Sequence, residues 1–174
     1  MIRKFAALAI AILSALSWHG CSTSGCTDNM SSIPLAGFYS SVTGQPVTLD
    51  SLDIHGIGAP GDSSLLAMGT QASMVYLPLR SEQAMTQYCI AYGWITIADK
   101  AMNDTLTMVY TASPYFASEE CGAAYRYRLH QVDYTRHMLD SVAVLDSLIT
   151  NVDCERLQLF LRVTPAQNGK PSKP

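Results

Sequence analysis

The sequence predicts an all-β protein: a single antiparallel β-sandwich, immunoglobulin-like in general architecture, with about 7–8 strands after an N-terminal signal peptide. Short segments alternate apolar and polar residues, and turn-forming residues separate them at fairly even spacing. Hydrophobic residues make up 48% of the 174 positions and charged residues only 14%, so the chain can bury one sizeable core. We expect one domain over residues 33–163, without internal repeats.

The first twenty residues have the layout of an export signal. Arg3 and Lys4 precede an apolar run that contains a single polar residue, as in signal peptides. The run is shorter than the ~20 apolar residues of a spanning helix, which disfavours an uncleaved anchor. Gly20-Cys21 looks like a lipoprotein cleavage junction, at which the cysteine thiol receives a diacylglycerol. The two preceding residues are atypical of that junction, so ordinary cleavage after Ser17 is the alternative.

The cysteine count favours lipidation. The chain has five cysteines, and an odd number leaves one unpaired in an exported protein. Lipid on Cys21 leaves an even set, namely Cys26, Cys89, Cys121 and Cys154. Residues 21–32 then form a flexible tether behind a signal peptide of residues 1–20, and residues 164–174 form a disordered tail.

Seven segments of the domain are expected to form strands, because each alternates apolar and polar residues. They are residues 47–54, 74–79, 94–98, 105–111, 125–134, 142–145 and 157–161. Pro78 suggests a sheet edge or a strand end. The charged connection "DKAMND" predicts that 94–98 and 105–111 pair as a hairpin. Helix-like spacing occurs only in "SEQAMTQYC", residues 81–89.

The segment 125–134 divides its side chains between two faces. Tyr125, Tyr127 and Leu129 should point one way, and the opposite way should point Arg126, Arg128 and His130. The basic row could receive an acidic partner or a glycan, but the solvated face of an antiparallel strand has the same composition. The nine tyrosines could likewise form a carbohydrate platform or pack in the sheets.

Charge and motifs exclude several classes of protein. The net charge of −3 becomes −5 without residues 1–20, since 9 basic residues (11 − 2) then face 14 acidic ones; nucleic-acid binding is not expected. The histidines and cysteines lack metal-ligand spacing, so we expect no metal and no cofactor. Residues 56–61 read G-x-G-x-x-G, but no amphipathic helix follows as nucleotide binding requires. A serine hydrolase would need a site dispersed over distant segments, with His55, His130 or His137 near a Ser and an Asp.

Residues 104–144 resemble a family of small uncharacterised lipoproteins from Bacteroidota. The similarity rests on three segments: "DTL" at 104–106 with Tyr110, "FASEECG" at 116–122, and "LDSV" at 139–142. Looser similarity covers most of residues 26–162. The resemblance implies an envelope location and assigns no activity.

The resemblance also bears on the cysteines and on modification. Family members generally retain the cysteines that correspond to Cys26 and Cys121, which implies a Cys26–Cys121 disulfide. Cys89 and Cys154 are additional, and a pair gained together would bond together. Bacteria of this lineage O-glycosylate Asp-Ser/Thr sequences before an aliphatic residue, and the matching acceptors are Ser51, Thr105, Ser141 and Ser147; the alternative is that these pairs simply end turns.

The expected function is that of a non-enzymatic binding or accessory module of the cell envelope. Its lipid would hold it to the outer membrane, and its partner would be an envelope protein or a glycan. Ser22 after the anchor favours the outer membrane, and the absence of acidic residues in "STSG" favours the periplasmic face over the cell surface. The alternative is a small periplasmic hydrolase with a dispersed Ser/His/Asp site.

Overall fold

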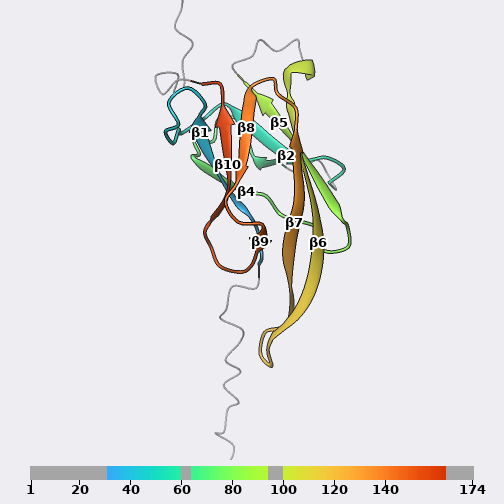
Figure 1. The fold of residues 1–174 in the computed structure, drawn as a ribbon. Coiled ribbons are helices and arrows are strands. Elements are labelled where there is room, and N and C mark those ends of the chain that lie inside the picture. The colour runs from blue at the N-terminus through green and yellow to red at the C-terminus, as the bar shows by residue number, and fades with distance from the viewer. Residues whose placement is uncertain (1–30, 60–63, 94–99, 164–174) are drawn as a thin grey trace, which may run out of the picture.

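The computed structural model describes residues 31–59, 64–93 and 100–163, and this part of the chain is all-β (Figure 1). Two sheets of four and six strands contain every strand of these described ranges. The described residues hold one short 3-10 turn, Lys100–Met102, and no α-helix. Among them no helix is long and apolar enough to span a membrane. The predicted all-β class is thus confirmed.

The six-stranded sheet is antiparallel throughout, in the order β3-β2-β5-β6-β7-β9. Its strands are β2 (Leu52–Gly56), β3 (Ser64–Leu66), β5 (Met85–Tyr92), β6 (Asp104–Ser118), β7 (Gly122–Tyr134) and β9 (Leu148–Ile149). The β6–β7 hairpin is much the longest element and extends well beyond its neighbours (Figure 1).

The four-stranded sheet has the order β4-β1-β10-β8. Its strands are β4 (Met74–Tyr76), β1 (Leu35–Ser40), β10 (Glu155–Leu161) and β8 (Leu139–Val144). The β1–β10 pair is parallel, so the prediction of a purely antiparallel arrangement is wrong. A parallel pair needs a long crossover rather than a turn, and here residues 41–154 separate β1 from β10.

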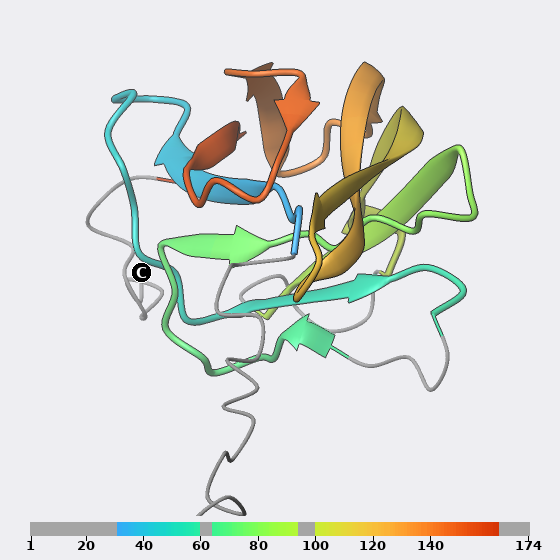
Figure 2. The ribbon, with the colours of Figure 1, turned by 90° about the horizontal axis from the view of Figure 1, so that it is seen from below.

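Both sheets contribute to one apolar core. Viewed from below, the layer that contains β1 and β10 lies against the larger sheet, which curves beside it (Figure 2). Alternate residues of each strand point into the core between the two sheets. The largest fully buried side chains are Tyr88, Tyr110, Phe38, Leu52, Ile54, Leu77, Ile90, Leu106, Met108, Leu139, Ile149 and Leu157.

The predicted hairpin of residues 94–98 and 105–111 is wrong in its partner. Residues 94–99 lie outside the described part, and β6 pairs instead with β5, in the register Met85↔Val109 to Ile90↔Asp104. The segment with helix-like spacing, 81–89, supplies the first half of β5. In β5 the side chains of Thr86, Tyr88 and Ile90 face the core and are buried. The residues between them are half-buried.

The remaining strand predictions fare better. The segments 125–134, 142–145 and 157–161 fall within or overlap β7, β8 and β10. Tyr127 and Leu129 are buried while the basic row opposite them is exposed, as predicted. In 47–54 only the second half forms a strand, although Val47 and Leu49 are buried. β1 was not predicted, because "LAGFYS" lacks polar alternation.

A buried carboxylate, Asp104, fixes the passage from one sheet to the other. It is fully buried at the start of β6 and accepts hydrogen bonds at 2.8 Å from the hydroxyls of Tyr92 and Thr135. It also accepts them from the backbone N–H groups of residues 137–139 at 2.7–2.9 Å. These residues link β7 in one sheet to β8 in the other, so a single side chain holds the crossover.

The Asp104 carboxyl has a lowered pKa. Burial raises this pKa, but hydrogen bonds from the backbone of His137 and Leu139 and from the hydroxyls of Thr135 and Tyr92 outweigh that effect. A carboxyl with a depressed folded-state pKa contributes stability above its unfolded pKa. That contribution is lost as the pH falls through the folded value.

Replacing Asp104 with Asn should therefore destabilise the protein at neutral pH by about 2–3 kcal/mol, because an amide nitrogen would face backbone donors that need an acceptor. Urea unfolding followed by circular dichroism measures the loss. The difference in unfolding free energy between the variant and the unmodified chain should begin to narrow below about pH 4, near the unfolded-state pKa. It should be lost as the pH falls through the lower folded-state pKa, where the buried carboxyl becomes protonated.

The matched control is Asp133→Asn. Asp133 is exposed and its hydrogen bond comes from Gln131, so its replacement should cost less than about 0.5 kcal/mol at either pH. Equal effects of the two substitutions would contradict the structural role of Asp104.

Candidate functional site

One Ser, Asp and His do come together on β2 and β3. Ser64 donates a short hydrogen bond to Oδ1 of Asp53, and Nδ1 of His55 lies 3.2 Å from Oδ2 of the same carboxylate. Asp53 thus stands between the other two residues. A catalytic triad requires the histidine in the middle, where it removes the proton from the serine. Neither interaction joins Ser64 to His55.

The other two histidines of the described ranges, His130 and His137, make local contacts. Nε2 of His130 lies 2.7 Å from the hydroxyl of Thr111 across the β6–β7 pair. His137 Nδ1 lies 3.1 Å from the carbonyl oxygen of Asn103 and 3.4 Å from Asp104. No group of three or more potential metal ligands occurs within the described ranges.

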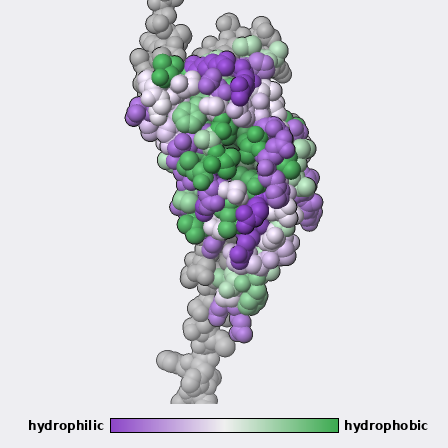
Figure 3. All heavy atoms as spheres, in the orientation of Figure 1, coloured by the Kyte–Doolittle hydropathy of each residue, from purple (hydrophilic) through white to green (hydrophobic). Residues whose placement is uncertain are grey.

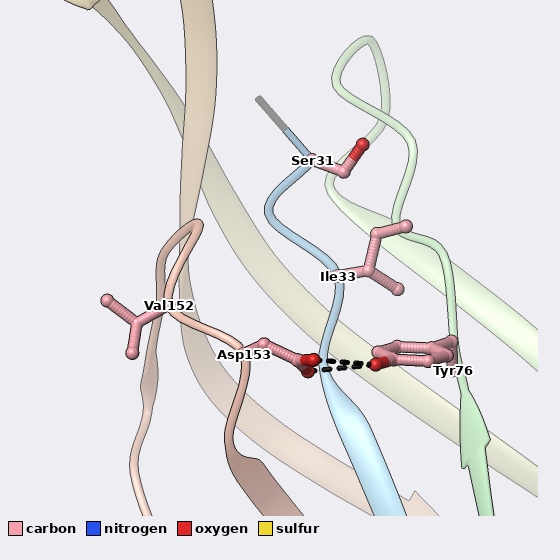
Figure 4. Close-up of a pocket in the computed structure, with 5 residues that line it drawn as sticks. All are labelled: Ser31, Ile33, Tyr76, Val152 and Asp153. Atoms are coloured by element: carbon pink, nitrogen blue, oxygen red, sulfur yellow. Dashed lines mark hydrogen bonds between the residues drawn. The ribbon is translucent and has the colours of Figure 1, made fainter. Parts of the chain in front are cut away.

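A small surface pocket of about 230 Å³ lies at one end of the four-stranded sheet. Its lining residues come from the start of the described chain, from β4 and from the loop before β10 (Figure 4). They are Ser31, Ile33, Tyr76, Val152 and Asp153. No sequence motif predicts this site, because Tyr76 and Asp153 are far apart in the chain and belong to no local pattern.

A hydroxyl–carboxylate pair forms the polar part of the pocket. The Tyr76 hydroxyl lies 2.9 and 3.0 Å from the two oxygens of Asp153, and this hydrogen bond raises the pKa of Tyr76 above its ordinary value. The Tyr76 side chain remains 47% exposed. The pocket therefore offers an aromatic face beside charged acceptor oxygens.

A second pair of the same type lies close by on β1 and β10. The Tyr39 hydroxyl donates to Oε2 of Glu155 at 3.0 Å, and Oε1 of Glu155 is buried with no hydrogen-bond partner among the described residues. Gly37 makes room for this carboxylate, since a Cβ there would come within 2.1 Å of Oε1. The four-stranded sheet thus carries two tyrosine–carboxylate pairs, and both carboxylates, Asp153 and Glu155, lie at or just before the start of β10.

Hydrophobic residues also gather on the surface of the face on which β8 and β10 lie (Figure 3). Val144 and Leu145 are exposed at the end of β8, and Phe160 of β10 is partly exposed beside Tyr39, with ring centroids 5.4 Å apart. Exposed apolar area of this kind marks interaction surfaces more often than catalytic ones.

The cysteines depart from the predicted pairing. Cys89 and Cys154 are both free, so the predicted Cys89–Cys154 disulfide is wrong. Cys89 points away from the core on β5, whereas Cys154 precedes β10 in the other sheet, and the core separates the two. Cys121 is disulfide-bonded. Its predicted partner, Cys26, lies outside the described residues, as do Cys21 and the whole predicted signal peptide, and that pairing stays a prediction.

The four candidate glycosylation acceptors are all partly accessible. Ser51 precedes β2 and donates to its neighbour Asp50 at 2.9 Å. Thr105 follows the buried Asp104, whose carboxylate holds the crossover, so this Asp-Thr pair has a structural reason to be there. Ser141 lies in β8 and Ser147 precedes β9.

A family model matches residues 51–161, more than half of the chain, and its description reads "Family of unknown function (DUF6452)". Among the strands that the structure describes, the match contains all except β1. It confirms the expectation of a family without assigned activity. No curated protein and no solved structure matches the chain.

The free thiols make a direct prediction. Alkylation without reductant should modify Cys154 quickly, because it is exposed, and Cys89 slowly, because burial and then the nearby Asp53 carboxylate raise its pKa. Mass spectrometry of peptides after timed labelling measures both rates. Cys154→Ser should abolish only the fast step; recovery of a Cys89–Cys154 disulfide instead would contradict the structure.

Proposed function

This chain belongs to the DUF6452 family of unknown function, and from that premise we propose that it is a lipid-anchored cell-envelope protein that binds a glycan without catalysing a reaction. The lipid would be carried by Cys21 after removal of residues 1–20, and the outer membrane, on its periplasmic face, is the proposed location. The bacterial lineage and the lipoprotein assignment follow from the resemblance of residues 104–144.

The proposal that the ligand is a glycan rests on one observation, the Tyr76–Asp153 pair in the pocket of Figure 4. Sugar rings present an apolar C–H face and a rim of hydroxyl groups. The half-exposed Tyr76 ring can stack on that face, and the carboxylate oxygens of Asp153 can accept hydrogen bonds from the sugar hydroxyls. Hydrogen bonds to charged acceptors are the stronger ones. The pocket is small, at about 230 Å³, which suits one residue of a longer polymer.

The hydrolase alternative has less support. The Ser64, Asp53 and His55 cluster has the aspartate in the middle, and it lies on the six-stranded sheet, whereas the pocket lies at the end of the other one. A nucleophile needs a base within hydrogen-bond reach. Binding accounts for the arrangement more simply.

The immunoglobulin-like sandwich also stands as our interpretation of the fold. Its support is the shared core of the two sheets and their layered arrangement. The parallel β1–β10 pair is a departure from that architecture.

The glycan proposal predicts that Tyr76→Ala weakens sedimentation with purified peptidoglycan sacculi or binding to immobilised envelope polysaccharide by roughly tenfold, because the stacking surface is lost. Tyr125→Ala is the matched control: its ring is 42% exposed but lies on the hairpin, so binding should be unchanged. Undiminished binding by the Tyr76 variant, with a native circular dichroism spectrum, would contradict the proposed site.

We further propose O-glycosylation of at least one of Ser51, Thr105, Ser141 and Ser147. The intact mass of the protein isolated from its own envelope should exceed that of the lipidated polypeptide, and peptide mapping should place the excess on one of these residues. A mass equal to the lipidated polypeptide alone excludes the modification.

A further inference from the structure

The basic row, Arg126, Arg128 and His130, lies along the outer face of the β6–β7 hairpin. All three side chains are exposed, on the face of β7 opposite the buried Tyr127 and Leu129. Alternate residues of an antiparallel strand are about 6.8 Å apart, so the row is a line of about 14 Å. The hairpin that carries it projects from the body of the two sheets (Figure 1).

The charges of Arg126 and Arg128 are not neutralised within the part of the chain that the structure describes. Neither guanidinium belongs to an ion pair there; the carboxylates that do are those of Asp53, Asp104, Asp140 and Asp146. Two like charges on neighbouring positions of one face repel each other, although the chain has more acidic residues than basic ones, 14 against 11. The row therefore attracts an anion from outside these residues.

An aromatic ring orients the first arginine of the row. The Arg126 guanidinium lies 4.3 Å from the centre of the Tyr115 ring on β6. A cation at this distance is attracted by the electrons of the ring, which is not a hydrogen-bond acceptor of the usual kind. The N–H donors of the guanidinium are therefore left for a ligand, and a guanidinium held in one orientation suits two-point binding of a carboxylate or a sulfate.

Hydroxyl groups of β6 run beside the row. The strand register places Thr111 opposite Arg128 and Ser113 opposite Arg126, and both hydroxyl residues are exposed. The Thr111 hydroxyl lies 2.7 Å from Nε2 of His130. A line of basic groups and a line of hydroxyls thus lie side by side on the outer face. A linear polymer that carries both anionic groups and hydroxyls matches both lines.

We propose that the basic row binds an acidic polysaccharide, with carboxylate or sulfate groups of the polymer on Arg126 and Arg128 and its hydroxyls on Thr111 and Ser113. The inference rests on the proposed function for the class of ligand, a glycan, and adds that the glycan is anionic. The row lies on the six-stranded sheet, whereas the pocket lies at one end of the four-stranded sheet. Each site can therefore be removed without the other.

The test measures binding of the full lipidated chain, in a neutral detergent, to fluorescently labelled polygalacturonate, dextran sulfate and uncharged dextran. Arg126→Gln and Arg128→Gln are made singly and together. Each exposed charge–charge contact contributes a factor of about two to five in affinity. The double variant should therefore bind both acidic polymers roughly tenfold more weakly, while its binding of uncharged dextran should not change.

The matched control is Arg136→Gln. Arg136 is also exposed and also lies beside an aromatic ring, with its guanidinium 5.4 Å from the centre of the Tyr134 ring, but it is not part of the row. Its replacement changes the net charge by the same amount as Arg126→Gln and should leave the affinity unchanged. An equal loss in the two single variants, with native circular dichroism spectra, would show an effect of net charge alone and overturn the site.

Polyglutamate tests the chemical class of the ligand. It supplies closely spaced carboxylates without sugar hydroxyls, so it should bind more weakly than polygalacturonate of the same charge. Binding of polyglutamate that is as tight, and is lost in the same arginine variants, would assign the row to an acidic protein and overturn the proposal. In 1 M NaCl the part of the affinity that depends on the arginines should disappear, because salt screens exposed charges; a dependence that persists would contradict the electrostatic basis.

Tyr76→Ala separates this inference from the proposed pocket. A loss of acidic-polymer binding in the arginine variants but not in Tyr76→Ala supports the row and removes the support for the pocket. A loss in Tyr76→Ala alone overturns the row and leaves the pocket standing. Losses in both sets of variants support both sites, and unchanged binding in all of them overturns both.

Discussion

The carboxylate of Asp104 is the interaction on which the arrangement of the two sheets depends. Three of its hydrogen bonds come from consecutive backbone N–H groups at residues 137–139, where the chain leaves β7 and enters β8. A buried charge is tolerated only when its hydrogen-bonding capacity is used. The crossover has to adopt the one conformation that supplies these donors, and this conformation delivers Leu139 into the core as the first residue of β8.

Tyrosine hydroxyls complete the same system at the other end of the core. The Tyr110 hydroxyl lies 2.6 Å from that of Thr86 and accepts the backbone N–H of Arg80 at 2.9 Å. Tyr92, which donates to Asp104, has its own pKa raised by burial and then by that carboxylate. Asp104 and Tyr110 are the first and last residues of the segment noted in the sequence, "DTL" followed by Tyr110. Their side chains thus hold loops in place rather than bind a ligand.

Much of the fold could be predicted from residue alternation. A strand with one solvent-exposed face has polar residues at alternate positions, and these positions indicate which face points outward. β7 is the clearest case, with Arg126, Arg128 and His130 opposite Tyr127 and Leu129. Alternation does not indicate which strands pair with each other. For this reason the sequence predicts residues 94–98, rather than β5, as the partner of β6. The alternation in β6 does indicate one buried polar residue. Asp104 falls at the same alternate positions as Leu106 and Met108, whose side chains point into the core, so a buried carboxylate could have been predicted. The pocket could not be predicted, since Tyr76 and Asp153 come together only because β1 and β10 lie side by side in parallel.

One alternation runs through β6 from Asp104 to Phe116, and the environment of each inward residue depends on what lies opposite. Where the four-stranded sheet faces β6, Leu106, Met108 and Tyr110 are buried. Past the end of that sheet the same phase brings Phe116 into solvent. Extending a hairpin beyond its cover exposes apolar area, which is unfavourable for an isolated domain. The long β6–β7 hairpin is therefore best understood as a surface built for a cover that the domain does not itself provide.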